Sequence, residues 1–217
     1  MKHLLWLIRR DFVLELRQPQ LLSGIVLHAL GSVWITYLAF KGMIPPDTWN
    51  GLLWVILLFS AIHATGRTFG SDSAGRRLYY YTLASPRNII LAKIVYNTLL
   101  ILLLGMITSL LYFLFNGNPI RHFLPFTLAL ILGTIGLSGI LTFTSGLAAQ
   151  EGRNFSLMAI LSLPVSAPML LLLIRLSSLS LQPLAITNLG GLILALLLLD
   201  LISIALAWIL FPYLWKE

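Results

Sequence analysis

The stretch GRTFGSDSAGRRLYYYTLASPRNIILAK, residues 66–93, is the longest polar interruption in a chain that is otherwise mostly apolar. It holds five of the fourteen Lys and Arg residues and three consecutive tyrosines. Of all 217 residues, 59% are hydrophobic and only 10% are charged, whereas roughly 25% of a soluble domain is charged. So few charges cannot cover a surface in water. We therefore expect an all-α integral membrane protein that forms one domain over residues 1–217, with residues 66–91 as a loop between two spans.

Six apolar stretches approach the length of about 20 residues that a helix needs to cross a bilayer. They cover residues 21–40, 49–65, 92–115, 123–149, 157–174 and 189–214. Two of them are marginal. The second is short, and the fifth contains Pro164 and Pro168, which we expect to break the helix.

Lys and Arg in short loops indicate which side of the membrane each loop faces. With the N-terminus inside, eleven of these residues lie inside, and only Lys41, Arg121 and Arg175 lie outside. We therefore expect both termini in the cytoplasm, and we interpret the net charge of +7 as loop charge rather than as a sign of a nucleic-acid partner. The chain has no cysteine, which excludes disulfides and thiolate metal sites. Four tryptophans lie near predicted span ends, where aromatic side chains meet lipid headgroups: Trp34, Trp49, Trp54 and Trp215.

Before the first span, residues 3–18 have the pattern of a helix. Four apolar residues share one narrow face, with two arginines opposite: Leu5, Ile8, Phe12 and Leu16 against Arg10 and Arg17. The helix either lies on the cytoplasmic leaflet or extends the first span. Gln18-Pro19-Gln20 supplies a break between the two, which favours an interfacial helix within residues 1–20.

Within the long loop, Ser85-Pro86 is a helix start, because Ser is a frequent N-cap and Pro suits the first helical position. Ser71-Asp72-Ser73 is able to cap a short helix through the tyrosines. The loop either docks a soluble partner or is a basic segment facing lipid headgroups. We favour docking, because the second interpretation explains the charges but not the length.

Two types of polar residue lie within the predicted spans. Asp200 is an acidic residue deep in the last span, where such residues are costly and serve either function or a structural polar contact. His28 and His63 are possible ligands of a metal or haem iron, but four scattered histidines without paired spacing favour hydrogen bonds between helices.

Backbone irregularities offer two further candidates. Pro164 and Pro168 lie one turn apart, and the carbonyls that they free at membrane depth mark either a packing kink or a gate. The stretch 123–149 is rich in Gly, Ser and Thr, which favours close helix packing over a substrate path.

The sequence contains no catalytic constellation. It has neither a Walker A loop nor an HExxH motif, and no Ser–Lys or paired-Asp arrangement lies in the predicted membrane segments. We therefore expect a protein that is not an enzyme, and any ATP-driven activity requires a separate ATPase subunit.

An interfacial helix, six spans, internal termini and a long first cytoplasmic loop form the plan of a type-2 ABC exporter permease. Within that class the chain resembles the CcmB family, the haem exporter protein B of bacterial cytochrome c maturation. Three segments and three single residues carry the resemblance: LLWVILLFSAIHATGRTF at 52–69, LASP at 83–86, ILSLPVSAPMLLLL at 160–173, Asp72, Gly75 and Lys93. Family members often have acidic residues after the loop glycine, whereas this chain has Arg76, Arg77 and three tyrosines.

The resemblance implies a multi-pass permease of the bacterial inner membrane that pairs with a cytoplasmic ATPase. It also implies other membrane proteins of cytochrome c maturation and a second copy of the chain as partners, besides lipid. ATP would bind in the partner, haem is a possible substrate, and no cofactor is expected in this chain. The residues expected to dock the ATPase are Asp72, Gly75, Arg76, Arg77, Tyr79, Tyr80 and Tyr81. The alternatives are export of a lipid, drug or polysaccharide, a scaffold that does not transport, and a secondary transporter coupled through Asp200.

Overall fold

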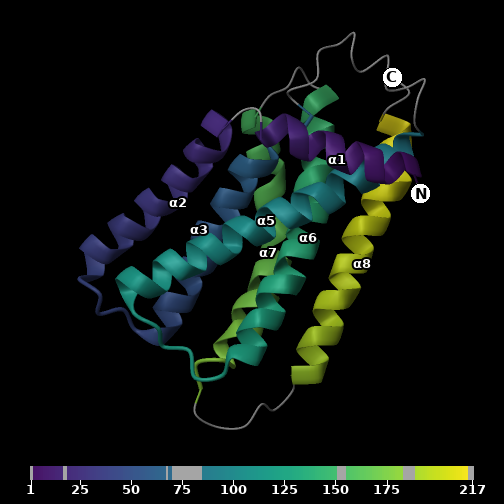
Figure 1. The fold of residues 1–217 in the computed structure, drawn as a ribbon. Coiled ribbons are helices and arrows are strands. Elements are labelled where there is room, and N and C mark those ends of the chain that lie inside the picture. Colours follow the sequence, from purple (N-terminus) through teal and green to yellow (C-terminus); the bar gives the residue numbers. More distant parts are fainter. Residues whose placement is uncertain are drawn as a thin grey trace.

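The computed structural model describes residues 2–16, 19–66, 68–69, 85–150, 155–182 and 189–214. These parts of the chain form seven helices and no strand (Figure 1). The helices are α1 (Lys2–Leu16), α2 (Pro19–Phe40), α3 (Pro46–Thr65), α5 (Pro86–Asn116), α6 (Phe123–Gln150), α7 (Phe155–Ser178) and α8 (Leu189–Leu214). All helices other than α1 are long and apolar enough to cross a membrane, which confirms the six predicted spans.

The N-terminal helix is separate from the first span, as predicted. Helix α1 ends at Leu16, and Pro19 is the first residue of α2, a position where the missing N–H of proline costs nothing. In Figure 1, α1 lies across one end of the bundle, which we call the α1 end. Because successive spans alternate in direction, α3, α6 and α8 end there, and α2, α5 and α7 begin there.

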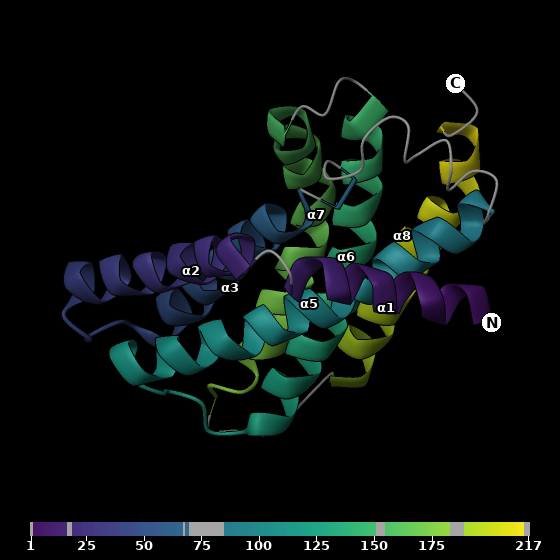
Figure 2. The same cartoon turned by 45° about the horizontal axis from the view of Figure 1, so that its top comes forward.

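Helix α6 is the central element of the bundle. In its most apolar 18-residue window, 72% of the residues are buried, against 17% in the corresponding windows of the outer spans α2 and α8. Figure 2 shows α2 and α3 on one side of α6 and α8 on the other. The chain therefore packs around its small-residue helix and leaves two spans largely uncovered.

Glycines on α6 let its neighbours approach closely, which confirms the predicted packing role of this stretch. A Cβ at Gly139 would lie 2.9 Å from Ser203 Oγ on α8, and one at Gly146 would lie 3.0 Å from a ring carbon of Phe211. On another side, a Cβ at Gly133 would lie 3.0 Å from the Trp54 ring. Side chains of facing helices therefore fill the space that each glycine leaves.

The expected break in the fifth span is wrong. Helix α7 continues from Phe155 to Ser178 through Pro164 and Pro168. Both prolines lie on the exposed side of the helix, where no neighbouring helix is forced apart by the rings. On the buried side, the Ser162 and Ser166 hydroxyls donate to carbonyls one turn earlier, at 3.1 and 3.2 Å. Each proline removes one backbone donor, and the remaining hydrogen bonds hold the helix.

The headgroup assignment of the tryptophans is wrong for two of the four. Trp49 and Trp54 are 1% and 2% exposed. The Trp49 indole donates to the Gly117 carbonyl at 3.2 Å, and the Trp54 indole donates to Ser177 Oγ at 2.8 Å. Trp34 is exposed on α2, and Trp215 lies outside the described residues. Position near a span end does not show whether a ring faces lipid or a neighbouring helix.

Candidate functional site

The predicted docking residues lie outside the part of the chain that the structure describes. They are Asp72, Gly75, Arg76, Arg77, Tyr79, Tyr80 and Tyr81. The structure does describe the two ends of the loop that carries them. How these ends are held determines which helices would respond to a force on the loop.

The second end of the loop is the start of α5, as predicted. Pro86 is the first residue of the helix, and Ser85 has the extended backbone of an N-cap. The Ser85 side chain makes no capping hydrogen bond. Its carbonyl instead accepts from the backbone N–H groups of Asn88 at 2.9 Å and Ile89 at 3.2 Å. The helix start was therefore predicted correctly, but the hydroxyl is not its cap.

The first end of the loop is held by buried hydrogen bonds to α5 and α6. The Thr68 hydroxyl donates to Asn97 Oδ1 at 3.2 Å, and Asn97 Nδ2 donates to Thr142 Oγ1 at 2.7 Å. The Ser145 hydroxyl donates to the Thr65 carbonyl at 3.1 Å. We call these five residues the Asn97 cluster. Buried polar groups are costly unless they are paired, so the cluster stabilises one position of Thr65 and Thr68 relative to both helices.

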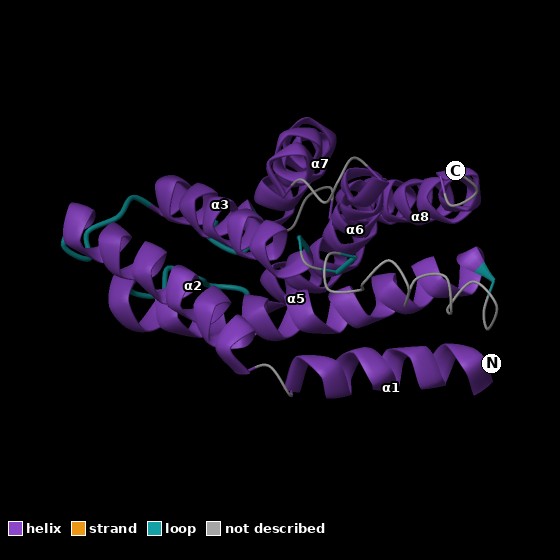
Figure 3. Ribbon diagram, turned by 90° about the horizontal axis from the view of Figure 1, so that it is seen from above, coloured by secondary structure: helices purple, strands orange, loops and turns teal. Residues whose placement is uncertain are grey.

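An ion cluster joins the same region to α1. Asp11 Oδ2 lies 3.2 Å from Lys93 Nζ on α5, and Asp11 Oδ1 lies 2.8 Å from Arg10 Nη2. The Asp11 and Lys93 side chains are only 6% and 9% exposed. Lys93 Nζ is also 5.8 Å from the centre of the Phe69 ring at the start of the loop. Figure 3 shows α1 running beside α5, the arrangement that permits this pairing.

An apolar cluster completes the junction at the α1 end. The Phe69 and Phe211 rings pack with their centres 5.5 Å apart. Helices α1, α5, α6 and α8 all contribute side chains to the cluster, whose members are Leu7, Phe69, Ile89, Ile90, Ala92, Ile94, Ala149, Ala207 and Phe211. The start of the loop therefore belongs to a cluster to which four helices contribute.

Sequence reasoning missed the ion cluster. It counted Lys93 among the cations of the 66–93 stretch and assigned no role to Asp11. Leu7 and Asp11 lie one turn apart and are both buried on α1. The available signal was an acidic residue one turn after Leu7 on the same side of the helix, because a buried charge requires a partner.

The intramembrane candidates do not form one site in the described structure. Asp200 on α8 faces Gly136 of α6, and Pro164 and Pro168 lie on the exposed side of α7. His63 on α3 stacks on His28 of α2, with ring centres 4.6 Å apart. No hydrogen bond or ion pair joins these residues to one another among those that the structure describes.

The expected hydrogen bond between helices through His63 is wrong. His63 Nδ1 lies 2.9 Å from the Phe59 carbonyl of its own helix. Its contacts with other helices are ring packing, on His28 and on Phe155. Within the described residues, no group of three His, Asp or Glu side chains has the geometry of a metal site.

Comparison with known proteins gives a family match, which covers nearly the whole chain. A protein-family model described as CcmB protein matches residues 2–211. The match begins in α1 and ends in the last turn of α8, so it includes the loop and all the elements of the junction. A comparison with curated proteins found no match.

Proposed function

Because the chain belongs to the CcmB family, we propose that it couples ATP hydrolysis in a separate ATPase subunit to haem export, or to release of a haem-loaded chaperone. Family members are multi-pass membrane proteins and permease components of the cytochrome c maturation ABC transporter. The chain therefore belongs to a transporter family and not to an enzyme family. ATP would bind in the partner subunit, and haem would be cargo.

The connection of the loop to the bundle is the observation that carries the coupling role. Thr65 and Thr68 are tied to α5 and α6 through the Asn97 cluster, and Lys93 ties α5 to α1. A force applied to residues 66–91 would therefore reach several spans together. A loop that only contacted headgroups would not need buried polar bonds at its base.

The mechanism is a shift between two arrangements of the spans. An ATPase pair that closes on ATP would contact the loop differently from an open pair. Only this difference in contact energy shifts the equilibrium of the permease. The ion cluster and the Asn97 cluster would then move the ends of α1, α5 and α6 as one body.

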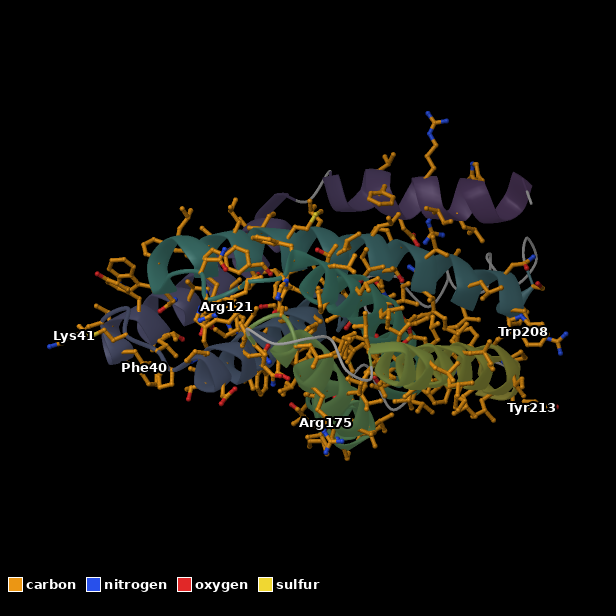
Figure 4. All side chains as sticks on the ribbon, turned by 90° about the horizontal axis from the view of Figure 1, so that it is seen from below. Phe40, Lys41, Arg121, Arg175, Trp208 and Tyr213 are labelled. Atoms are coloured by element: carbon orange, nitrogen blue, oxygen red, sulfur yellow. The ribbon has the colours of Figure 1, made fainter. Side chains whose placement is uncertain are left out.

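The orientation follows from charge. The α1 end would face the cytoplasm of a bacterial cell, with both termini and the docking loop there. The outside cations Lys41, Arg121 and Arg175 belong to the opposite end, which Figure 4 shows from below. The uncovered faces of α2 and α8 would contact lipid, a second copy of the chain, or other membrane proteins of cytochrome c maturation.

Purification from native membranes tests this function. We expect an ATP-binding subunit and haem-handling proteins to co-purify with the chain. Alanine substitution across residues 76–81 should abolish both ATPase association and maturation of c-type cytochromes, whereas Lys41→Ala at the opposite end should preserve both. Intact association and maturation in the loop variant would contradict the docking role.

Other outcomes identify the alternatives. Normal c-type cytochromes in a deletion strain would indicate export of a lipid, drug or polysaccharide. Full function with an ATPase-inactive partner would indicate a scaffold. Transport without any ATPase that is lost on substitution of Asp200 would indicate a secondary transporter.

A further inference from the structure

Asp200 is a buried acid that the coupling mechanism does not use. It lies near the middle of α8 and is 4% exposed. Neither carboxylate oxygen has a hydrogen-bond partner among the described residues, and both are shielded from solvent. The Ser203 hydroxyl donates to the Asp200 backbone carbonyl and not to the carboxylate. A carboxylate without a partner at this depth is strongly unfavourable.

The helices that pack on α8 offer Asp200 no opposite charge. Helix α6 contains no ionisable residue, and the only one on α7 is Arg175, which is exposed in its last turn. On α8 itself, the other ionisable side chain is Tyr213, which is 72% exposed near the far end.

The ionisable residues of α5, the remaining neighbour, lie against other groups. Lys93 pairs with Asp11, and the Arg87 guanidinium lies 4.6 Å from the centre of the Trp208 ring. The Tyr96 ring packs on Phe12, and the Tyr112 ring packs on Trp49. Among the residues that the structure describes, no neighbouring helix thus provides a counter-charge that would keep Asp200 ionised.

The space around the carboxyl is filled. A Cβ added to Gly136 would overlap both Asp200 Oδ1 and the end of the Met169 side chain of α7. The Asp200 carboxyl therefore occupies the space that a side chain at Gly136 would fill, and the end of the Met169 side chain lies in the same space. An ionised carboxylate requires several hydrogen-bond donors, and water supplies them only if α8 separates from α6.

We propose that Asp200 is a proton-binding site. It is a neutral carboxylic acid in the packed bundle, and loss of its proton to entering water is coupled to separation of α8 from α6 and α7. Only 17% of the most apolar 18-residue window of α8 is buried, so most of its surface lies outside the bundle and does not oppose an outward movement. In Figure 1, α8 lies at the edge of the bundle beside α6. This site does not depend on the proposed docking of an ATPase.

Infrared spectroscopy of the purified full-length protein in lipid tests the protonation state. The wild-type protein should show a carboxylic-acid C=O band at neutral pH that shifts in D2O. The band should be absent from Asp200→Asn, which imitates the neutral acid in size and charge, and displaced in Asp200→Glu. Absence of this band from the wild type at neutral pH would overturn the proposal.

Thiol accessibility tests the movement. The natural chain has no cysteine, so Ser203→Cys, which faces Gly139 in the α6–α8 seam, reports alone. As the acid band disappears with rising pH, modification by a small water-soluble thiol reagent should accelerate. The same cysteine in an Asp200→Asn background should accelerate only through ionisation of its own thiol, so the ratio of the two rates isolates the part that depends on Asp200.

Two controls complete the design. Ala129→Cys, fully buried on α6, should stay protected over the same pH range, which excludes general unfolding. Gly136→Ala should make Ser203→Cys accessible at a lower pH, because the added Cβ forces the carboxyl away from α6. Equal reactivity of Ser203→Cys in both Asp200 backgrounds at every pH would overturn the coupling.

Discussion

Asp11 on α1 and Lys93 on α5 form a buried ion pair, with 3.2 Å between Oδ2 and Nζ. The pair fastens the N-terminal helix α1 to α5, the span that begins directly after the loop of residues 66–91. Arg10 contacts the second carboxylate oxygen, so the negative charge of Asp11 is shared by two cations. Because Phe69 at the start of the loop lies beside the same lysine, the pair is part of the junction on which coupling would depend.

Breaking this ion pair should destabilise the protein more than removing both charges. We expect Lys93→Met to cost about 3 kcal/mol, because it leaves Asp11 buried with one cation fewer. The double variant Asp11→Asn with Lys93→Met should recover much of this loss. Thermal unfolding in lipid nanodiscs, with cytochrome c maturation measured in parallel, checks both statements. Arg9→Ala, on the exposed side of α1, is the control that should change neither property.

Asn97 should be required for the position of Thr68 at the start of the loop that we propose docks the ATPase. Asn97→Ala removes two buried hydrogen bonds and leaves Thr68 and Thr142 without their partner, which should cost about 1–3 kcal/mol. Limited proteolysis should cut within residues 66–91 faster in this variant. The matched control is Asn88→Ala, because Asn88 is exposed on the same helix. Equal cleavage rates in the two variants would show that the Asn97 cluster does not hold the loop.

Substitution of glycine by alanine should destabilise the protein on α6 but not on α2. Gly139→Ala inserts a methyl group 2.9 Å from Ser203 Oγ, and overpacking of this kind costs about 1–3 kcal/mol. Gly31→Ala on α2 meets nothing within 4 Å, so the helix preference for alanine should make it neutral or stabilising by about 0.5 kcal/mol. The unfolding temperatures of the two variants, compared with that of the wild type, test both expectations. A loss of stability in Gly31→Ala would reveal a partner on α2 instead.

Replacement by phenylalanine should destabilise the protein at Trp54 but hardly at Trp34. Trp54→Phe loses the hydrogen bond to Ser177 and leaves a space in the core, so we expect a loss of at least about 1 kcal/mol. Trp34→Phe changes a ring that is 45% exposed and should have little effect. Both stabilities are measurable by denaturation in mixed micelles. Similar values for the two variants would favour the headgroup assignment that the structure contradicts.

Local rules explain why much of the fold was predictable. A span requires an uninterrupted apolar segment, and the bounds predicted for 123–149 and 189–214 agree closely with α6 and α8. Pro19 and Pro86 start helices because a proline at the first helical position sacrifices no hydrogen bond. The same local reasoning failed at Pro164, because whether a helix survives an internal proline depends on what packs beside it.

The sequence by itself determined the class of this protein, its spans and their order, because hydrophobic length and helix-start signals act within about 20 residues. Only the tertiary structure decided which polar groups are paired. Asp11 meets Lys93, Thr68 meets Asn97, and Trp54 meets Ser177 across 123 positions of sequence. Asp200 meets no partner among the described residues. Such pairings depend on which faces of distant helices are brought together, and no local pattern records that packing.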